Sequence, residues 1–261
     1  MPELICNEEF RQKDKSVWVS YFLFIDFIMR IGIYDPYLDD LGGGEKYMMT
    51  VAECLAKDHQ VEVFWDNKED LEAVKKRFSL SLEGVELTKN VFSPKVGTWE
   101  RLSQTNKYGA LIVLSYGSIP LVLSKKLFLH IQQPLQAVEY AGIKNKFKFL
   151  RVTEIFYNSI FTKTYNEKNF TGIKSSIIYP PVDLFPMEIE KENMIVHVGR
   201  FRVKTVKDSG DFKKQGVMIE AFKQMVDDKL KGWKFVIAAS VKREDEGAFS
   251  IVQEAAKGYP V

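Results

Sequence analysis

The chain has 261 residues, of which 46% are hydrophobic and 28% are charged, a composition typical of a globular protein with one large or two modest domains. Its 37 lysines and arginines nearly balance its 35 aspartates and glutamates, and a net charge of +2 argues against a protein built to bind nucleic acid. Two cysteines in a chain of this length argue against a disulfide framework and fit a reducing cytoplasm, and three histidines without clustered cysteines carry no zinc signature.

Residues 1–28 stand apart from the rest of the chain. An apolar, aromatic run at residues 17–28 follows several basic residues, but it is shorter than the ~20 residues of a spanning helix, and Asp26 interrupts it. A signal peptide also begins with basic residues, yet no small-residue cleavage site follows here. We favour a third interpretation, in which residues 1–28 are an extension of an overlong reading frame and the natural protein starts at Met29.

The first regular pattern is a short strand, a glycine loop and a helix. Residues 31–34 are apolar, and Gly42, Gly43 and Gly44 then precede a helix with apolar residues at core spacing, namely Tyr47, Met48, Val51, Leu55 and Ala56. Glycines before a helix let the backbone approach a ligand closely, and the helix N-terminus attracts anions. Taken alone, a flexible turn explains this loop equally well.

Three further segments continue the pattern. Residues 59–65 and 108–115 predict buried strands, and residues 126–134 predict a strand that ends in a polar turn and a proline. His130 lies near the carboxyl end of this strand, where α/β folds place ligands, and its imidazole could hydrogen-bond a ligand hydroxyl. A lone histidine of this kind is more often structural, so both interpretations stay open.

Basic and aromatic residues alternate between Lys144 and Arg151. Such a stretch can lie on an anionic membrane surface or bind an acidic acceptor. We favour the alternative, an amphipathic helix with a solvated basic face.

A connector follows and separates two domains. Pro180 and Pro181 fix an extended backbone that no helix can cross, and Pro186 and an acidic run continue the same character. We place the boundary near Phe185, which gives an N-terminal domain of residues 29–185 and a C-terminal domain of residues 186–261.

The second domain opens with a pattern suited to a diphosphate. Residues 194–198 predict a strand closed by Gly199 and Arg200, and Lys213 and Lys214 stand before a helix with Val217, Met218, Ala221 and Phe222 on one side. Two cations beside the N–H groups of a helix N-terminus attract an anion. Taken alone, this pattern also fits a solvated loop. Residues 233–239 predict another buried strand.

Together, these segments resemble family 4 (group 1) glycosyltransferases of the GT-B fold, in the same order and over roughly residues 29–261. The resemblance rests on the glycine loop, the strand-end histidine and proline, an Asn-Ser-x-Phe-Thr segment at residues 158–162, Tyr-Pro-Pro-Val-Asp at residues 179–183, and the Gly-Arg and Lys segment at residues 199–222. Two features depart from it. Gln132 and Gln133 both precede Pro134, and residues 238–240 lack the glycine that relatives carry.

The resemblance implies an α/β protein of GT-B fold with two Rossmann-like domains, the second incomplete, because the family's Glu-x7-Glu segment has no counterpart before Val261. It implies transfer of a sugar from a nucleotide-sugar donor to a sugar, lipid-linked or protein acceptor, with retention of configuration and without a metal or other cofactor. It further implies a cytoplasmic enzyme of glycan biosynthesis, with peripheral membrane contact as an alternative.

The resemblance also implies a role for each site residue. Arg200 and Lys213 neutralise the leaving diphosphate, with Lys214 as the substitute for Lys213, and His130 positions the reacting sugar or the acceptor. The backbone at Gly199, Gly43 and Gly44 lies against the donor phosphates, with Gly42 as the alternative register.

Two other functions stay open. A non-catalytic GT-B remnant could act as a partner or scaffold. A nicotinamide-dependent enzyme is disfavoured, because no G-x-G-x-x-G with a downstream acidic residue follows the first strand.

Overall fold

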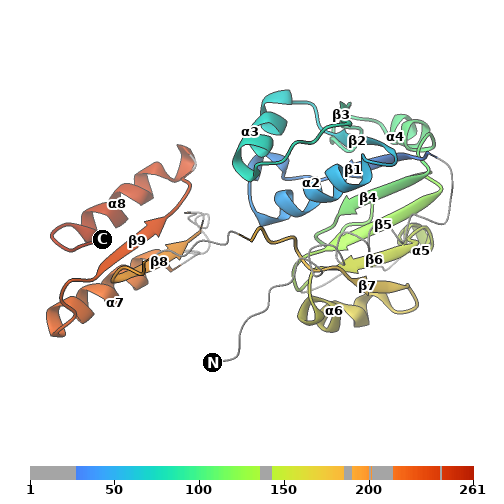
Figure 1. The fold of residues 1–261 in the computed structure, drawn as a ribbon. Helices are drawn as coiled ribbons and strands as arrows, with labels where there is room; N and C mark the ends of the chain where they lie inside the picture. Colours follow the sequence, from blue (N-terminus) through green and yellow to red (C-terminus); the bar gives the residue numbers. More distant parts are fainter. Residues whose placement is uncertain (1–27, 136–142, 185–189, 200, 202–213, 242) are drawn as a thin grey trace. The chain divides into compact units, whose positions relative to one another are not determined.

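A computed structural model describes residues 28–135, 143–184, 190–199, 201, 214–241 and 243–261 (Figure 1). The chain forms two compact units, Met1–Asp183 and Leu184–Val261. The domain boundary expected near Phe185 concerns residues outside the described ranges and stays a prediction.

The first unit is built on a parallel sheet of seven strands with the order β3-β2-β1-β4-β5-β6-β7. Its strands are β1 (Arg30–Tyr34), β2 (Gln60–Phe64), β3 (Val85–Thr88), β4 (Ala110–Leu114), β5 (Lys126–Ile131), β6 (Glu154–Tyr157) and β7 (Ser175–Ile177). All five residues of β4 are buried, as a continuous apolar run requires when helices cover both faces of a sheet. The strand order reverses between β1 and β4, and the carboxyl ends of these strands flank the point where such sheets bind ligands.

Helices cover both faces of this sheet (Figure 1). They are α2 (Gly43–Leu55), α3 (Lys68–Phe78), α4 (Thr98–Thr105), α5 (Ile143–Leu150) and α6 (Ile160–Asn166), with short 3-10 turns η1 (Leu38–Asp40) and η2 (Glu167–Phe170). Polar side chains fix several helix starts: Asn67 accepts the Glu69 N–H, and Ser159 accepts the Thr162 N–H.

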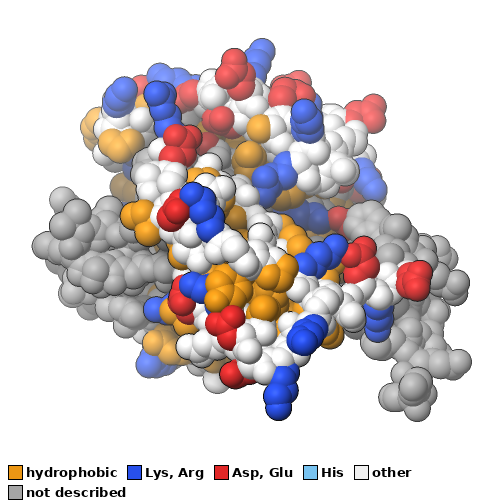
Figure 2. Space-filling model, turned by 90° about the vertical axis from the view of Figure 1, so that its left-hand side faces the viewer, with side chains coloured by type: hydrophobic (Ala, Val, Ile, Leu, Met, Phe, Trp, Pro, Cys, Tyr) orange, Lys and Arg blue, Asp and Glu red, His pale blue; other side chains and the backbone are white. Residues whose placement is uncertain are grey.

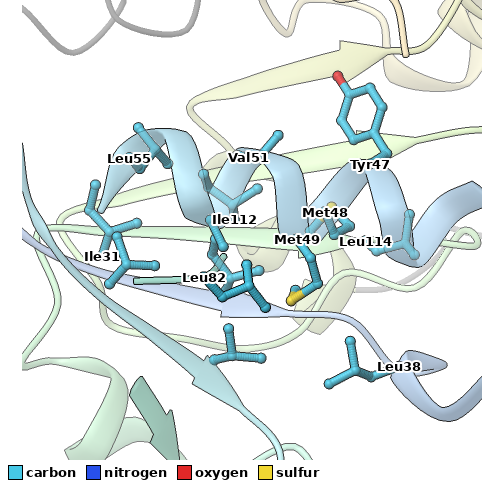
Figure 3. Packing of buried hydrophobic residues seen from close by; sticks show 14 of the residues in the cluster. Ile31, Leu38, Tyr47, Met48, Met49, Val51, Leu55, Leu82, Ile112 and Leu114 are labelled. Atoms are coloured by element: carbon cyan, nitrogen blue, oxygen red, sulfur yellow. The ribbon is translucent and has the colours of Figure 1, made fainter. Parts of the chain in front are cut away.

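The core of the first unit has one hydrophobic cluster on each side of the sheet. Figure 3 shows the first cluster, in which Met48, Val51 and Leu55 of α2 lie against strand residues such as Ile31 and Ile112. The second cluster gathers around Leu129, Ile155 and Tyr157. Because α2 buries one whole side in the core, its N-terminus is held at the carboxyl edge of the sheet.

The second unit pairs two parallel strands, β8 (Met194–Val198) and β9 (Lys234–Ala238), with α7 (Gln215–Asp228), the turn η3 (Arg243–Asp245) and α8 (Glu246–Ala256). A small core of Ile219, Phe222 and Phe235 joins the helices to one face of the strands. In β8, Ile195 packs against this core, whereas Val196 and Val198 are 51% and 77% exposed. Figure 2 shows hydrophobic side chains lying among charged ones on one face of the molecule.

The α/β architecture predicted from the sequence is confirmed, and each apolar run assigned to a strand forms one. The burial predicted for the two strands of the second unit is wrong: β8 contains no buried residue and β9 only Phe235, because the described helices pack on one face of the pair. The basic and aromatic stretch forms α5, on which Phe147 and Leu150 are 53% and 82% exposed. Of the N-terminal extension, residues 1–27 lie outside the described ranges. No helix in the described part of the chain is long and apolar enough to cross a membrane.

Gly32 in β1 provides a test of this packing. A Cβ there would overlap the Leu111 side chain and lie 2.6 Å from Cε2 of Phe64, and both side chains are buried. We expect Gly32→Ala to lower the free energy of unfolding by about 1–3 kcal/mol, because the extra methyl group overpacks the core.

Gly43→Ala is the matched control, because nothing lies within 4 Å of its added Cβ at the start of α2. It should leave the free energy of unfolding unchanged or raise it. The measurement is urea unfolding of both variants. An equal loss of unfolding free energy in Gly32→Ala and Gly43→Ala would contradict the packing of β1 described above.

Candidate functional site

Buried polar side chains gather at the carboxyl edge of the seven-stranded sheet. Asp35 follows β1, Ser115 follows β4, and His130 lies in β5, with exposed fractions of 1%, 2% and 0%. The Ser115 N–H donates to the His130 carbonyl oxygen at 2.8 Å. Residues far apart in the sequence therefore meet at the edge where parallel sheets bind ligands.

His130 is held between a strand and a helix. Its Nδ1 lies 3.1 Å from the Phe156 carbonyl oxygen of β6, and its ring stacks on the Tyr47 ring of α2 with centroids 4.0 Å apart. The Tyr47 hydroxyl in turn donates to the Ile178 carbonyl oxygen at 3.0 Å. Both rings are thus fixed in orientation.

Burial lowers the pKa of His130 to about 3, so the imidazole is neutral near pH 7. With Nδ1–H donating to the Phe156 carbonyl, Nε2 carries the lone pair, and this buried atom has no hydrogen-bond partner. His130 thus offers a hydrogen-bond acceptor and no positive charge. The role predicted for it in positioning a sugar or acceptor stays a prediction.

The glycine loop meets the exit of β5. A Cβ on Gly44 would lie 2.7 Å from Oε1 of Gln132, so only glycine allows this close approach without moving the glutamine. At Gly43 the space is open. The structure therefore brings together two segments that the sequence singled out, the glycine loop and the segment after His130.

The N-terminus of α2 is capped by a side chain of the same helix, that of Glu45. The Gly42 N–H donates to a carboxylate oxygen of Glu45, which is itself buried. This carboxylate places negative charge where a helix N-terminus would otherwise attract an anion. The expected contact of Gly43 and Gly44 with donor phosphates stays a prediction.

The asparagine of the Asn-Ser-x-Phe-Thr segment forms a hydrogen bond to the segment that follows β5. Asn158 donates to the Gln132 carbonyl oxygen at 2.9 Å. Asn166, at the end of α6, donates to the Gln133 carbonyl oxygen at 3.0 Å and accepts the Leu135 N–H at 2.9 Å. These side chains fix the path of the chain after β5.

The proline-rich segment is tied to the same helix. Asp183 forms an ion pair with Lys46 of α2, one residue before Tyr47. The four motifs of the first unit therefore converge on the N-terminal part of α2 and the carboxyl ends of the strands beside it.

The second unit presents a strand end and a helix start. Gly199 follows β8, and Lys214 precedes α7 with a left-handed backbone, at φ 59° and ψ 26°. Arg200 and Lys213, the two cations of the predicted diphosphate site, lie outside the described residues.

Two buried polar groups near this helix start escaped the sequence analysis. Gln215, the first residue of α7, is fully buried, and neither its amide oxygen nor its nitrogen has a hydrogen-bond partner. The Nε2 atom of His197, in β8, also has none, and it would lie 3.1 Å from a Cβ on Gly199. In the sequence, Gln215 directly follows Lys214 and His197 lies two residues before Gly199. These positions were the signal that could have identified them as site residues.

Asp35 is the third residue that the sequence analysis missed. Its Oδ1 accepts the Tyr37 N–H at 2.9 Å, whereas the buried Oδ2 has no hydrogen-bond partner. Burial, and then the negative charge of Glu45, raise the pKa of Asp35 from its ordinary value of 3.8 to about 7, although the Tyr37 N–H opposes the rise. An aspartate directly after the first strand was the signal that pointed to it.

Metal ligands do not cluster in the described ranges of the chain, where no group of three or more His, Cys, Asp or Glu side chains could hold an ion.

Comparison by sequence finds no matching protein-family model and no matching curated protein. Comparison by structure finds two crystal structures of HepE (Alr3699) from Anabaena, one in complex with UDP and glucose and one with UDP. The first matches with a TM-score of 0.57 at 14% identity, over 88% of this chain and 67% of HepE. The second matches with a TM-score of 0.55 at 13% identity, over 87% of this chain and 65% of HepE.

The chain thus spans about two thirds of the length of HepE. At this level of identity the likeness establishes the fold, and it confirms the predicted Rossmann-like architecture.

Asp35 and His130 predict opposite pH dependences of stability. Between about pH 4 and 7, folded Asp35 keeps a proton that the unfolded chain loses, so stability falls as the pH rises. Between about pH 3 and 6.5, the unfolded chain binds a proton at His130 that the folded chain does not, so stability rises with pH. The two contributions offset each other from about pH 4 to 6.5.

Single variants should reveal each contribution. Relative to the unchanged chain, we expect Asp35→Asn to gain stability as the pH rises from 4.5 to 6.5 and His130→Gln to lose it, each by about 1–3 kcal/mol. Urea unfolding at the two pH values measures these differences, and the comparison of slopes removes any loss of packing common to both pH values. If the stability difference from the unchanged chain varied with pH in the same direction in both variants, the protonation states given above would be contradicted.

Proposed function

We propose that this protein is a glycosyltransferase that moves a sugar from a nucleotide-sugar donor to an acceptor. The observation that carries this proposal is the likeness to HepE over 88% of the chain, because HepE has been crystallised with UDP and glucose. The order of the sequence motifs and their convergence in the first unit support the same conclusion.

The donor diphosphate binds at the start of α7 in this proposal. Gly199 ends the strand beside it, Arg200 and Lys213 supply positive charge, and Lys214 can replace Lys213. The unpartnered amide of Gln215 supports the assignment, because a buried polar group without a partner costs free energy until a ligand satisfies it. Fixed cations there would stabilise the charge that develops on the leaving diphosphate.

The first unit supplies neutral hydrogen-bonding groups in this proposal. His130 has no charge near pH 7, so it orients a sugar hydroxyl through Nε2 and does not act as a cation. The imidazole is fully buried beneath Tyr47, and reaching a hydroxyl requires a small displacement of that ring. Gly44 acts by allowing α2 to approach Gln132.

The finer parts of the proposal rest on the family resemblance. They are a hexosyl donor, retention of configuration, independence from metal ions, a cytoplasmic location and a role in glycan biosynthesis. A scaffold without catalytic activity is the competing proposal, and an assay for sugar transfer distinguishes it from an enzyme.

The donor site is tested by binding of UDP-glucose. We expect Arg200→Ala and Lys213→Ala each to weaken binding by about 10- to 100-fold, since a hydrogen bond to a charged group contributes about 1.5–3 kcal/mol. Isothermal titration calorimetry measures the dissociation constants.

Lys231→Ala is the matched control, because Lys231 is an exposed cation of the same unit that precedes β9 and so lies toward the opposite edge of the strands. Its loss should leave binding unchanged. Equal weakening by all three substitutions would show that general positive charge attracts the donor. Binding of a nicotinamide dinucleotide in place of UDP-glucose would overturn the proposal.

A further inference from the structure

Two exposed tyrosines meet at the carboxyl edge of the first unit, where the strand order reverses. Tyr37 follows β1 and Tyr116 follows β4, and their ring centroids lie 5.0 Å apart at an interplanar angle of 87°. They are 43% and 39% exposed. The pair thus presents aromatic ring surface to solvent at the point where sheets of this kind bind ligands.

Hydrogen bonds fix the chain around both tyrosines. The Tyr37 N–H donates to Asp35, and its carbonyl oxygen accepts the Asp40 N–H at 2.8 Å. Beside Tyr116, the Ser115 hydroxyl donates to the Ser118 carbonyl oxygen at 2.8 Å and accepts the Gly117 N–H at 3.2 Å. The aromatic pair is therefore preorganised, and a ligand would order little of it on binding.

A carboxyl oxygen without a hydrogen-bond partner is joined to the same pair. Asp35 holds Tyr37 through Oδ1, while its Oδ2 is buried and makes no hydrogen bond. A buried carboxyl oxygen without a partner costs free energy, and a sugar hydroxyl, which can both donate and accept, would relieve that cost. Aromatic surface beside a single polar group is the usual composition of a small-molecule site.

The charge around this site selects among ligands. The charged side chains that act on Asp35 are Glu45, Asp40 and Asp39, and all of them are acidic. Lys46 lies close in sequence, but it is paired with Asp183. A phosphate or carboxylate on the ligand would be repelled, whereas the apolar ring face and the hydroxyls of a neutral sugar would not.

We propose that Tyr37, Tyr116 and Asp35 form a subsite for a neutral pyranose of the acceptor, with the sugar ring packed on the tyrosines and a hydroxyl hydrogen-bonded to Asp35. This inference rests on the proposed function and deepens it. It adds that the part of the acceptor that binds at this subsite is a neutral saccharide. Reaching Oδ2 requires the β1 loop to open slightly, because Asp35 is 1% exposed.

The test is saturation-transfer-difference NMR on the full chain with maltose, cellobiose, lactose and mannobiose as neutral probes, and with glucose 6-phosphate as an anionic probe. We expect at least one neutral disaccharide to bind and the phosphorylated sugar to bind more weakly. Tyr37→Ala and Tyr116→Ala should each weaken the neutral probe by about tenfold, as the loss of one aromatic contact implies. Asp35→Asn should weaken it as well.

Tyr165→Ala is the matched control, because Tyr165 in α6 is 39% exposed, the same fraction as Tyr116. Its loss should leave saccharide binding unchanged, and Tyr116→Phe should retain it. The inference is overturned if no disaccharide binds, if glucose 6-phosphate binds more tightly, or if the alanine variants bind like the unchanged chain.

Binding of UDP by the same samples keeps the two proposals separate. If UDP binds and no disaccharide does, the saccharide subsite fails and the glycosyltransferase proposal stands. If a disaccharide binds through the tyrosines and UDP does not, the subsite stands and the glycosyltransferase proposal fails.

Discussion

The packing of α2 onto the carboxyl edge of the sheet is the constraint on which the candidate site of the first unit depends. Stacking on Tyr47 buries and orients His130, and the missing side chain of Gly44 lets the helix start approach Gln132. Asn158 and Asn166 then hold the loop that Gln132 begins. A shift of this helix would therefore alter the contacts of His130 and of Gln132 together, because the helix is rigid and its other side lies in the core.

The two units differ in the charge of their candidate binding groups. The edge of the first unit carries a neutral histidine and an aspartate with a raised pKa, and neither group carries positive charge near pH 7. The cations that the sequence pattern associates with a diphosphate belong to the second unit, around α7. A nucleotide sugar has one strongly anionic part and one neutral, hydroxyl-rich part. In the proposed function, the cations of the second unit would bind the anionic part.

The sequence could predict what depends on local patterns. The continuous apolar run of β4 predicts a strand buried on both faces, and the run of glycines predicts the close approach of backbone found at Gly44, although Gly43 and Gly44 form the first turn of α2 and not a loop before it. The sequence could not predict contacts that depend on the order of strands in the sheet. Tyr37 and Tyr116 meet only because β1 pairs with β4 as well as with its neighbour in sequence, β2. The unpartnered oxygen of Asp35 likewise depends on what surrounds the side chain in three dimensions, which no local pattern records.

The second unit couples stability to ligand binding more directly than the first. Its described core is small, and Val196 and Val198 on the other face of its strands are exposed. Packing of α7 and α8 on one face supplies the burial that an isolated pair of strands lacks, but it leaves the other face open. A ligand that binds only the folded unit stabilises it in proportion to the logarithm of its concentration over the dissociation constant. A diphosphate that satisfied Gln215 at the start of α7 would therefore contribute a larger share of the stability here than a ligand could in the seven-stranded unit.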